Sequence, residues 1–132
     1  MLIRKMFVSY DFVNDANHKN LLMAWAKNHD FAFSVNDRSV DVSVDSTDAV
    51  EIKRVISASV RAATFFLCLI GKETHKSQWV AWEIAKAVEL KKRLVAVKID
   101  KDDVSPAGLL NQGASWTLSF SLDGIAKAID AS

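Results

Sequence analysis

The chain has 132 residues, half of them apolar and a quarter charged, which suffices for one domain with one hydrophobic core. Its 17 Lys and Arg nearly balance its 16 Asp and Glu, so we expect no general affinity for nucleic acid or for an anionic membrane. No stretch approaches the roughly 18 apolar residues of a membrane-spanning helix, and the start does not resemble a secretory leader. We therefore expect a single domain over residues 1–132, located in the cytoplasm.

Two strands flank a helix in the first quarter of the chain. Apolar residues 6–10 predict a strand that ends in a polar segment over 11–17. A helix is expected over 18–28, and a second strand over 31–35, where apolar side chains alternate with small or polar ones. The face of the helix that should be buried consists of Leu21, Leu22, Trp25 and Ala26.

The segment after the second strand allows two interpretations. Residues 39–46 alternate strictly between Val and Ser or Asp, so they form either a hairpin with 31–35 or an extended loop over the sheet edge. A helix follows, because apolar residues then recur at a helical period as far as Ala63. Asp48 and Glu51 have the spacing of a capping box at its start.

The second half of the chain continues the alternation. Residues 64–70 form an apolar strand that contains Cys68, which we expect to be a buried small hydrophobe. No periodicity marks 101–115, so this segment predicts a long surface loop. The other predicted elements are a helix over 77–92, a strand over 94–99, a strand over 116–121 and a helix over 122–131.

This order of elements predicts a parallel sheet, because strands that are separated by helices cannot pair through hairpins. The first, third and fourth strands are apolar throughout, as interior strands are, whereas the second and fifth alternate, as edge strands do. The strand order 2-1-3-4-5 places those two at the edges. We therefore predict an α/β fold: a flavodoxin-like three-layer sandwich with five parallel strands and helices on both faces.

The strand order also predicts where a ligand binds. In such sheets ligands lie beyond the carboxyl ends of the strands, near the point where the order reverses, here between the first and third strands. The loops at that point are 9–17, 36–48 and 71–77. They carry a dense polar set: Ser9, Tyr10, Asp11, Asn14, Asp15, Asp37, Arg38, Ser39, Thr74, His75 and Ser77.

The helix after Ser77 holds an aromatic side chain and a carboxylate one turn apart. Glu83 is expected to point away from the buried face, with Trp79 beside it. The pair indicates a functional site; alternatively, the helix dipole alone favours a Glu in an early turn and Trp79 covers a neighbouring loop. The face expected to pack on the sheet consists of Ala81, Ile84, Ala85 and Val88.

Other nucleotide and metal motifs are missing from the sequence. With four glycines, neither a dinucleotide-binding GxGxxG motif nor a P-loop is present. One Cys and three His show no metal-ligand spacing, so we expect no metal site.

Two segments resemble TIR domains. Met-Phe-Val-Ser-Tyr over 6–10 resembles their opening strand, and Ser-Gln-Trp-Val-Ala-Trp-Glu-Ile over 77–84 resembles the box in which Ser, Trp and Glu precede a helix. With Ile-Gly over 70–71 in register, the resemblance is to the TIR-like branch typified by ThsB of the bacterial Thoeris anti-phage system, over roughly 5–99. The Arg-Asp…Pro-Gly loop of receptor-type TIR domains is missing, so their adaptor surface is not expected.

The resemblance implies activity on NAD, as a substrate and not as a cofactor. Glu83 corresponds to the glutamate that acts on the nicotinamide ribose in catalytic TIR domains. Tyr10, Phe12 and Trp79 are expected to stack on nicotinamide or adenine. Arg38, loop amides or the start of the 77–92 helix are expected to hold the pyrophosphate. The full expected substrate-binding set is Ser9, Tyr10, Asp11, Phe12, Asp37, Arg38, Thr74, Ser77 and Trp79.

The same resemblance implies a product and partners. Cleavage of the nicotinamide–ribose bond yields a cyclic or conjugated ADP-ribose signal for a separate effector, and a homo-oligomer completes the site with a neighbour's loop. Two alternatives stay open: a non-catalytic nucleotide-binding or scaffold module of the same shape, and an NAD hydrolase that depletes NAD instead of signalling.

Overall fold

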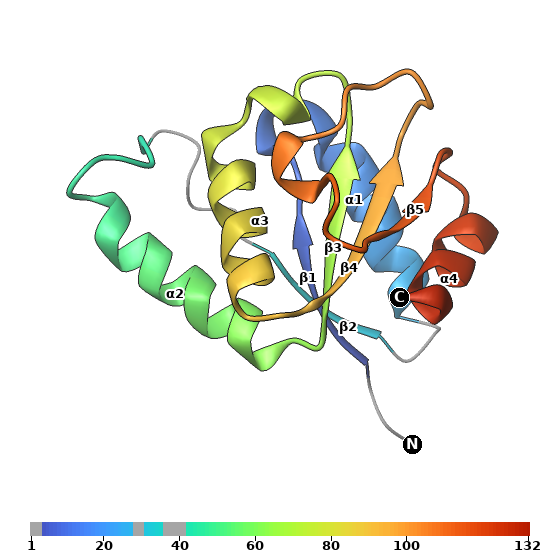
Figure 1. The fold of residues 1–132 in the computed structure, drawn as a ribbon, viewed down its shortest axis with the longest axis horizontal. Helices are drawn as coiled ribbons and strands as arrows, with labels where there is room; N and C mark the ends of the chain where they lie inside the picture. Colours follow the sequence, from blue (N-terminus) through green and yellow to red (C-terminus); the bar gives the residue numbers. More distant parts are fainter. Residues whose placement is uncertain (1–3, 28–30, 36–41) are drawn as a thin grey trace.

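The computed structural model describes residues 4–27, 31–35 and 42–132. In this part of the chain five strands form one sheet in the order β2-β1-β3-β4-β5, and every pairing is parallel (Figure 1). The predicted α/β flavodoxin-like architecture is therefore confirmed. The strands are β1 (Arg4–Ser9), β2 (Phe31–Val35), β3 (Phe65–Ile70), β4 (Arg93–Lys98) and β5 (Ser115–Thr117).

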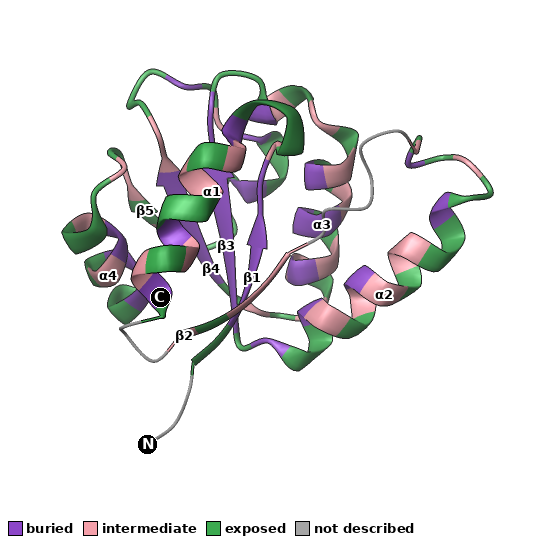
Figure 2. Cartoon of the chain, turned by 180° about the vertical axis from the view of Figure 1, so that it is seen from behind, coloured by how far each residue is buried: buried purple, intermediate pink, exposed green. Residues whose placement is uncertain are grey.

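Helices cover both faces of this sheet. Figures 1 and 2 show α2 and α3 on one face and α1 and α4 on the other. Two 3-10 turns, η1 (Thr74–Lys76) and η2 (Ala107–Leu109), lie in the connections after β3 and β4. The helices are α1 (Phe12–Ala26), α2 (Ala49–Ala62), α3 (Gln78–Glu89) and α4 (Leu122–Ala131).

The core is divided by the sheet into two layers. Along β1, Phe7 packs with the α2 and α3 layer, where its ring stacks on Phe66 at 5.7 Å between centroids. Met6 and Val8 face the other layer, with α1 and α4. All six residues of β3 are buried, as expected of an interior strand (Figure 2). Burying each such large side chain contributes about 1.5–3 kcal/mol.

The first helix begins six residues earlier than predicted, at Phe12 instead of residue 18. The side chain of Asp11 caps it by accepting the Val13 N–H at 3.1 Å, so the polar segment supplies the first turns of the helix. Asp15 has non-helical backbone angles, φ −117° and ψ 17°, and bends the helix there. The predicted buried face was partly wrong, because Leu22 and Ala26 are buried but Leu21 is 59% exposed.

The start of α2 differs from the predicted capping box. The Asp48 side chain makes no capping hydrogen bond. Instead, the N–H groups of Ala49 and Val50 donate to the carbonyls of Ser46 and Thr47, so a preceding turn satisfies them. Residues 42–48 form bends and turns and not a strand, and the rest of the predicted alternation, 39–41, lies outside the described residues.

The segment over 101–115 was predicted to be a surface loop, but part of it belongs to the core. Leu109 in η2 is buried at 1% exposure and packs in the α2 and α3 layer, and Asp103 is also buried. The fifth strand has three residues, 115–117, where residues 116–121 were predicted. Hydrophobic periodicity does not predict burial in an irregular segment, because its buried residues do not recur at a helical or strand spacing.

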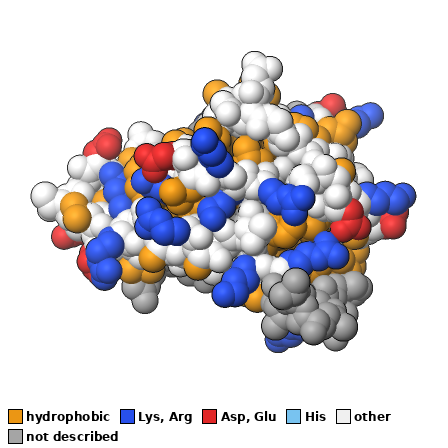
Figure 3. All heavy atoms as spheres, turned by 60° about the horizontal axis from the view of Figure 1, so that its bottom comes forward, with side chains coloured by type: hydrophobic (Ala, Val, Ile, Leu, Met, Phe, Trp, Pro, Cys, Tyr) orange, Lys and Arg blue, Asp and Glu red, His pale blue; other side chains and the backbone are white. Residues whose placement is uncertain are grey.

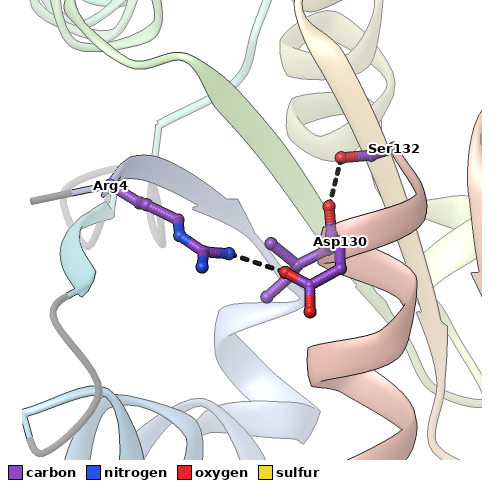
Figure 4. Close-up of polar contacts among 4 residues, drawn as sticks. Arg4, Asp130 and Ser132 are labelled. Atoms are coloured by element: carbon purple, nitrogen blue, oxygen red, sulfur yellow. Dashed lines mark hydrogen bonds and ion pairs between the residues drawn. The ribbon is translucent and has the colours of Figure 1, made fainter. Parts of the chain in front are cut away.

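The C-terminal helix is linked to the start of β1. Arg4 donates to Asp130 at 2.8 Å, and Ser132 Oγ donates to the Ile129 carbonyl at 2.7 Å (Figure 4). Both charged side chains are largely exposed, so this ion pair contributes about 0–1 kcal/mol.

Basic side chains gather on the face where the strands begin (Figure 3). The Thr64 N–H donates to the Lys5 carbonyl and the Arg93 N–H to the Thr64 carbonyl, which places exposed Lys5 and Arg93 on β1 and β4, the two strands that flank β3. Lys92 Nζ reaches the Arg61 carbonyl at 2.9 Å beside them. This basic face is at the opposite end of the sheet from the carboxyl ends of the strands.

Candidate functional site

Glu83 and Ser9 form a buried hydrogen bond at the carboxyl end of β1. Ser9 Oγ donates to Glu83 Oε1 at 2.7 Å, and Ser9 is 1% exposed and Glu83 4% exposed. Ser9 ends its strand with its side chain on the face that α3 covers, the same face as Phe7 two residues earlier. The fold thus brings a carboxylate to the predicted ligand-binding end of the sheet.

The predicted direction of Glu83 was wrong. It lies on the buried face of α3 with Val80, Ile84 and Ala87, whereas Ala81 and Ala85, assigned to that face, are exposed. The buried positions follow the helical spacing i, i+3, i+4, i+7, in which Glu83 is the i+3 residue. A buried face that is predicted from apolar residues alone omits position 83, because the side chain there is charged.

Trp79 fixes the segment that precedes α2. Its Nε1 donates to the Val42 carbonyl at 2.7 Å, and its ring meets that of Trp82 edge-on at 6.3 Å between centroids. Trp79 is partly buried against the α2 and α3 layer. The structure agrees with the alternative interpretation, in which this side chain covers a neighbouring loop. Stacking of Trp79 on a ligand stays a prediction.

The pKa of the Cys68 thiol is affected by the negative charge of Glu83. Cys68 lies opposite Ser9 in the pairing of β1 with β3 and is fully buried, as predicted. Burial raises the pKa of the Cys68 thiol, and the nearby carboxylates of Glu83 and Asp15 raise it further. The thiol therefore stays protonated at neutral pH and is not a nucleophile.

The loop between β3 and α3 is organised by Thr74 and Ser77. The Ser77 hydroxyl caps α3 by accepting the Val80 N–H at 3.2 Å. Thr74 Oγ1 accepts the Gly71 N–H at 2.8 Å and donates to Asp15 Oδ2 at 3.2 Å. Two predicted substrate-binding residues thus hold the chain that leads to Glu83.

Asp15 is a buried residue that the sequence did not single out from its polar set. Its carboxylate lies against Gly71, where a Cβ would come within 2.4 Å of Oδ2. Burial raises the pKa of Asp15, and the charges of Asp11 and Asp103 act in the same direction. The buried neighbours come from distant parts of the chain, so no local pattern predicts this environment.

The residues that follow Ser9 turn to the other side of the sheet. Tyr10 is buried in the α1 and α4 layer, with Lys19 Nζ 5.4 Å from its ring centroid. Phe12 is exposed at the start of α1, with its ring centroid 6.2 Å from that of Tyr10. Asp11 caps that helix.

Two predicted residues, Asp37 and Arg38, lie outside the described residues. Among the residues that the structure does describe, no group of three or more His, Cys, Asp or Glu is arranged to hold a metal ion. No helix in the same part of the chain is long and apolar enough to cross a membrane.

Comparison with known proteins supports the family resemblance. The family model described as Thoeris protein ThsB, TIR-like domain, matches residues 7–103, a range that contains Ser9, Trp79 and Glu83. The predicted resemblance to a ThsB-type TIR-like domain is thereby confirmed. No curated protein matches the chain by sequence.

Two solved structures share the fold. One is a 2-deoxyribosyltransferase from the psychrotolerant bacterium Bacillus psychrosaccharolyticus, with a TM-score of 0.66 and 12% identity, covering 88% of this chain and 87% of that one. The other comprises the TIR domains of the activated Roq1 resistosome, which directly recognises the pathogen effector XopQ; its TM-score is 0.53 at 13% identity, covering 74% of this chain and 60% of that one. At such identities the likeness shows the fold alone.

Proposed function

The chain belongs to the TIR-like domain family of Thoeris protein ThsB, and from that membership we propose that it cleaves the nicotinamide–ribose bond of NAD. The proposed product is a cyclic or conjugated ADP-ribose that signals to a separate effector in the cytoplasm. The observation that carries the proposal is the buried Glu83 carboxylate, which Ser9 holds at the carboxyl end of β1.

The chemistry suits a carboxylate. When the bond between ribose C1′ and the pyridinium nitrogen breaks, both electrons leave with nicotinamide, which becomes neutral, and positive charge develops on the sugar. A carboxylate beside the ribose stabilises that charge, as carboxylates do in glycoside cleavage. Addition of water at C1′ then gives ADP-ribose and a proton, whereas attack by an atom of the adenosine half gives a cyclic product.

The surroundings of Glu83 favour this role. Water is largely excluded from a side chain that is 4% exposed, so its charge acts through a lower effective dielectric constant than in bulk water. The hydrogen bond from Ser9 holds the carboxylate in one orientation before substrate arrives. We propose that an assembly of several copies completes the site.

The structure supports a role in substrate binding for some of the predicted residues, and the family resemblance alone supports it for the others. Phe12 presents an exposed ring for stacking, and the start of α3 at Ser77 presents helix N–H groups suited to a pyrophosphate. For Tyr10, Asp11, Asp37, Arg38, Thr74 and Trp79, contact with substrate is proposed from the family resemblance.

The deciding experiment measures nicotinamide release from NAD by the full chain, alone and with an extract of phage-infected cells. Glu83→Gln keeps the shape of the side chain and removes its charge, and we expect turnover to fall at least about a hundredfold. The matched control is Glu89→Gln, because Glu89 lies on the same helix but is exposed and pairs with Lys86. Its turnover should be unchanged.

Product analysis separates the remaining alternatives. A cyclic product weighs one water less than ADP-ribose, a conjugate weighs more, and plain ADP-ribose as the sole product indicates NAD depletion. If neither condition gives turnover while NAD still binds, the non-catalytic nucleotide-binding module replaces the enzyme as the better account.

A further inference from the structure

The basic face at the amino ends of the strands carries positive charge that its neighbours do not balance (Figure 3). Its cationic side chains are Lys5, Arg61, Lys91, Lys92 and Arg93. Within the described residues, none of the five forms an ion pair with an Asp or Glu. The nearby Glu89 pairs with Lys86 at 2.7 Å, and this contact and the charge of Arg61 lower its pKa. The face is therefore suited to an acidic partner.

Two pockets open on this face, on the side of the sheet that α2 and α3 cover. The first, of about 230 Å³, lies between β1, β2 and the end of α2, and Lys5 is its charged residue. The second, of about 280 Å³, lies between β4, the end of α3 and the segment before β5. Lys91 and Lys92 line it together with apolar Val88 and Leu94. No Asp or Glu is among the described residues that line either pocket.

The two pockets are linked by one hydrogen bond. Lys92, which lines the second pocket, donates through Nζ to the Arg61 carbonyl at 2.9 Å. The next residue, Ala62, lines the first pocket. Since a closed cavity of about 150 Å³ holds a benzene molecule, each pocket has room for one apolar side chain.

The strand order sets the distance between the pockets. One lies between β2 and β1, and the other beside β4 toward β5, in a sheet of order β2-β1-β3-β4-β5. About three strand spacings, roughly 14 Å in all, therefore separate them. In an extended chain, side chains four positions apart point to the same side and lie about 13 Å apart. The two pockets thus match two side chains of one extended segment.

The backbone at Lys91 carries a side chain where glycine is usual. Lys91 follows α3 with a φ of 56°, and the Lys92 N–H donates to the Ala87 carbonyl at 3.0 Å to close the helix end. This left-handed conformation is disfavoured for residues with a side chain. The helix dipole favours a cation at this end, but Lys92 already supplies one. Lys91 therefore adds charge beside the second pocket at a conformational cost.

We propose that the basic face binds an acidic, extended segment of another protein, with one apolar side chain in each pocket. The carboxylates of the segment pair with Lys5, Lys91 and Arg93, and the two apolar side chains fix its position. The proposal does not depend on NAD cleavage, because Glu83 lies at the opposite end of the sheet.

A lipid surface and a nucleic acid fit the face less well. The large apolar side chains that the described part of the chain exposes do not line the pockets, so the pockets present no apolar group to insert into a bilayer. Nucleic-acid bases stack on exposed aromatic rings. Phe33 is the aromatic residue among the described linings, and it packs into the α1 and α4 layer.

Fluorescence anisotropy tests the proposal with the peptide fluorescein-EELEDELEE-amide, titrated with the full chain at low ionic strength. Its two leucines are four positions apart, and we expect saturable binding of one peptide per chain. The matched peptide fluorescein-EESEDESEE-amide has the same charge but serines in place of the leucines. Its affinity should be at least about tenfold lower, because two apolar side chains no longer become buried.

Two double variants show whether binding is local to the face. Lys5→Gln/Lys91→Gln removes one charge beside each pocket and should weaken binding of the leucine peptide about fivefold. Lys72→Gln/Lys101→Gln removes two exposed charges after β3 and β4, at the opposite end of the sheet. Its affinity should stay within twofold of the unaltered chain, and thermal unfolding confirms that each variant is folded.

Several outcomes would overturn the proposal. These are absence of binding of the leucine peptide, equal affinity for the two peptides, and an equal loss in the two double variants. Tighter binding of an oligo-dT strand or of phosphatidylglycerol vesicles than of the leucine peptide would overturn it as well, and would assign the face to that partner.

Discussion

The carboxylate of Asp15 occupies the space that a Cβ on Gly71 requires. The distance from that position to Asp15 Oδ2 is 2.4 Å, well inside a normal contact. The contact joins the bend in α1 to the end of β3, and Thr74 bridges the same two segments through its hydroxyl. Glycine at position 71 is therefore required by a neighbouring side chain.

Gly71→Ala should destabilise the fold by about 1–3 kcal/mol, since an added methyl group must displace a buried carboxyl group or the backbone. Urea unfolding followed by circular dichroism measures the change. Asp15→Ala removes the obstructing group, so the double variant Gly71→Ala/Asp15→Ala should lose less stability than the two single losses add up to. Strict additivity would show that the clash is not the cause.

Asp15→Asn should change how stability depends on pH. Burial raises the pKa of Asp15 above its ordinary value of 3.8, so the folded chain holds this proton more tightly than the unfolded chain. The free-energy cost of burying the ionised carboxylate is therefore present in full above the pKa of Asp15 in the folded chain. This cost disappears as the pH falls toward 3.8. We expect Asn to stabilise the folded chain at pH 7 and to do so progressively less as the pH falls toward 4.

Unfolding free energies measured at several pH values check this prediction. Asp102→Asn is the control, because it removes the same charge from a side chain that is exposed. If Asp15→Asn destabilises the chain equally at every pH, the hydrogen bond from Thr74 outweighs the cost of burying the charge.

Ser9→Ala should weaken both stability and the proposed activity. The change removes the donor to Glu83 Oε1, and a buried carboxylate that loses such a partner costs about 1–3 kcal/mol. A double-mutant cycle with Glu83→Gln, read by urea unfolding and by nicotinamide release, isolates the pair. A coupling free energy near zero in both measurements would contradict the role assigned to this hydrogen bond.

The sequence predicted elements well where one local pattern determined the structure. The alternation over 31–35 predicted both ends of β2 correctly, and α4 spans 122–131 as predicted. Interior strands were recognised because burial on both faces leaves an unbroken apolar run. The strand order followed from these patterns, and with it the end of the sheet where Glu83 lies.

The errors at Glu83, Asp15 and Asp103 share one physical cause, which is burial of polar residues through distant partners. Glu83 is buried because Ser9, 74 positions away, supplies its hydrogen bond. Asp15 is buried with Thr74, which is 59 positions away. Periodicity assigns charged residues to solvent, so it placed Glu83 on the wrong face of α3 and left Asp103 in a surface loop.

Trp79→Phe should loosen the segment that precedes α2. The ring and its packing are largely kept, but the hydrogen bond from Nε1 to the Val42 carbonyl is lost. We expect a stability loss of about 0.5–1.5 kcal/mol and faster cleavage after Asp45 or Asp48 by Glu-C protease in phosphate buffer, where this enzyme cleaves after Asp as well as Glu. Mass spectrometry of the fragments identifies the bond that is cut.

Trp82→Phe is the matched control for this prediction. Trp82 lies on the same helix and packs against the same layer, but its indole N–H makes no hydrogen bond within the described part of the chain. Its variant should therefore be cleaved at the rate of the unaltered protein. Equal acceleration in both variants would mean that aromatic packing holds residues 42–48 in place, and the indole N–H of Trp79 would then have no special part in it.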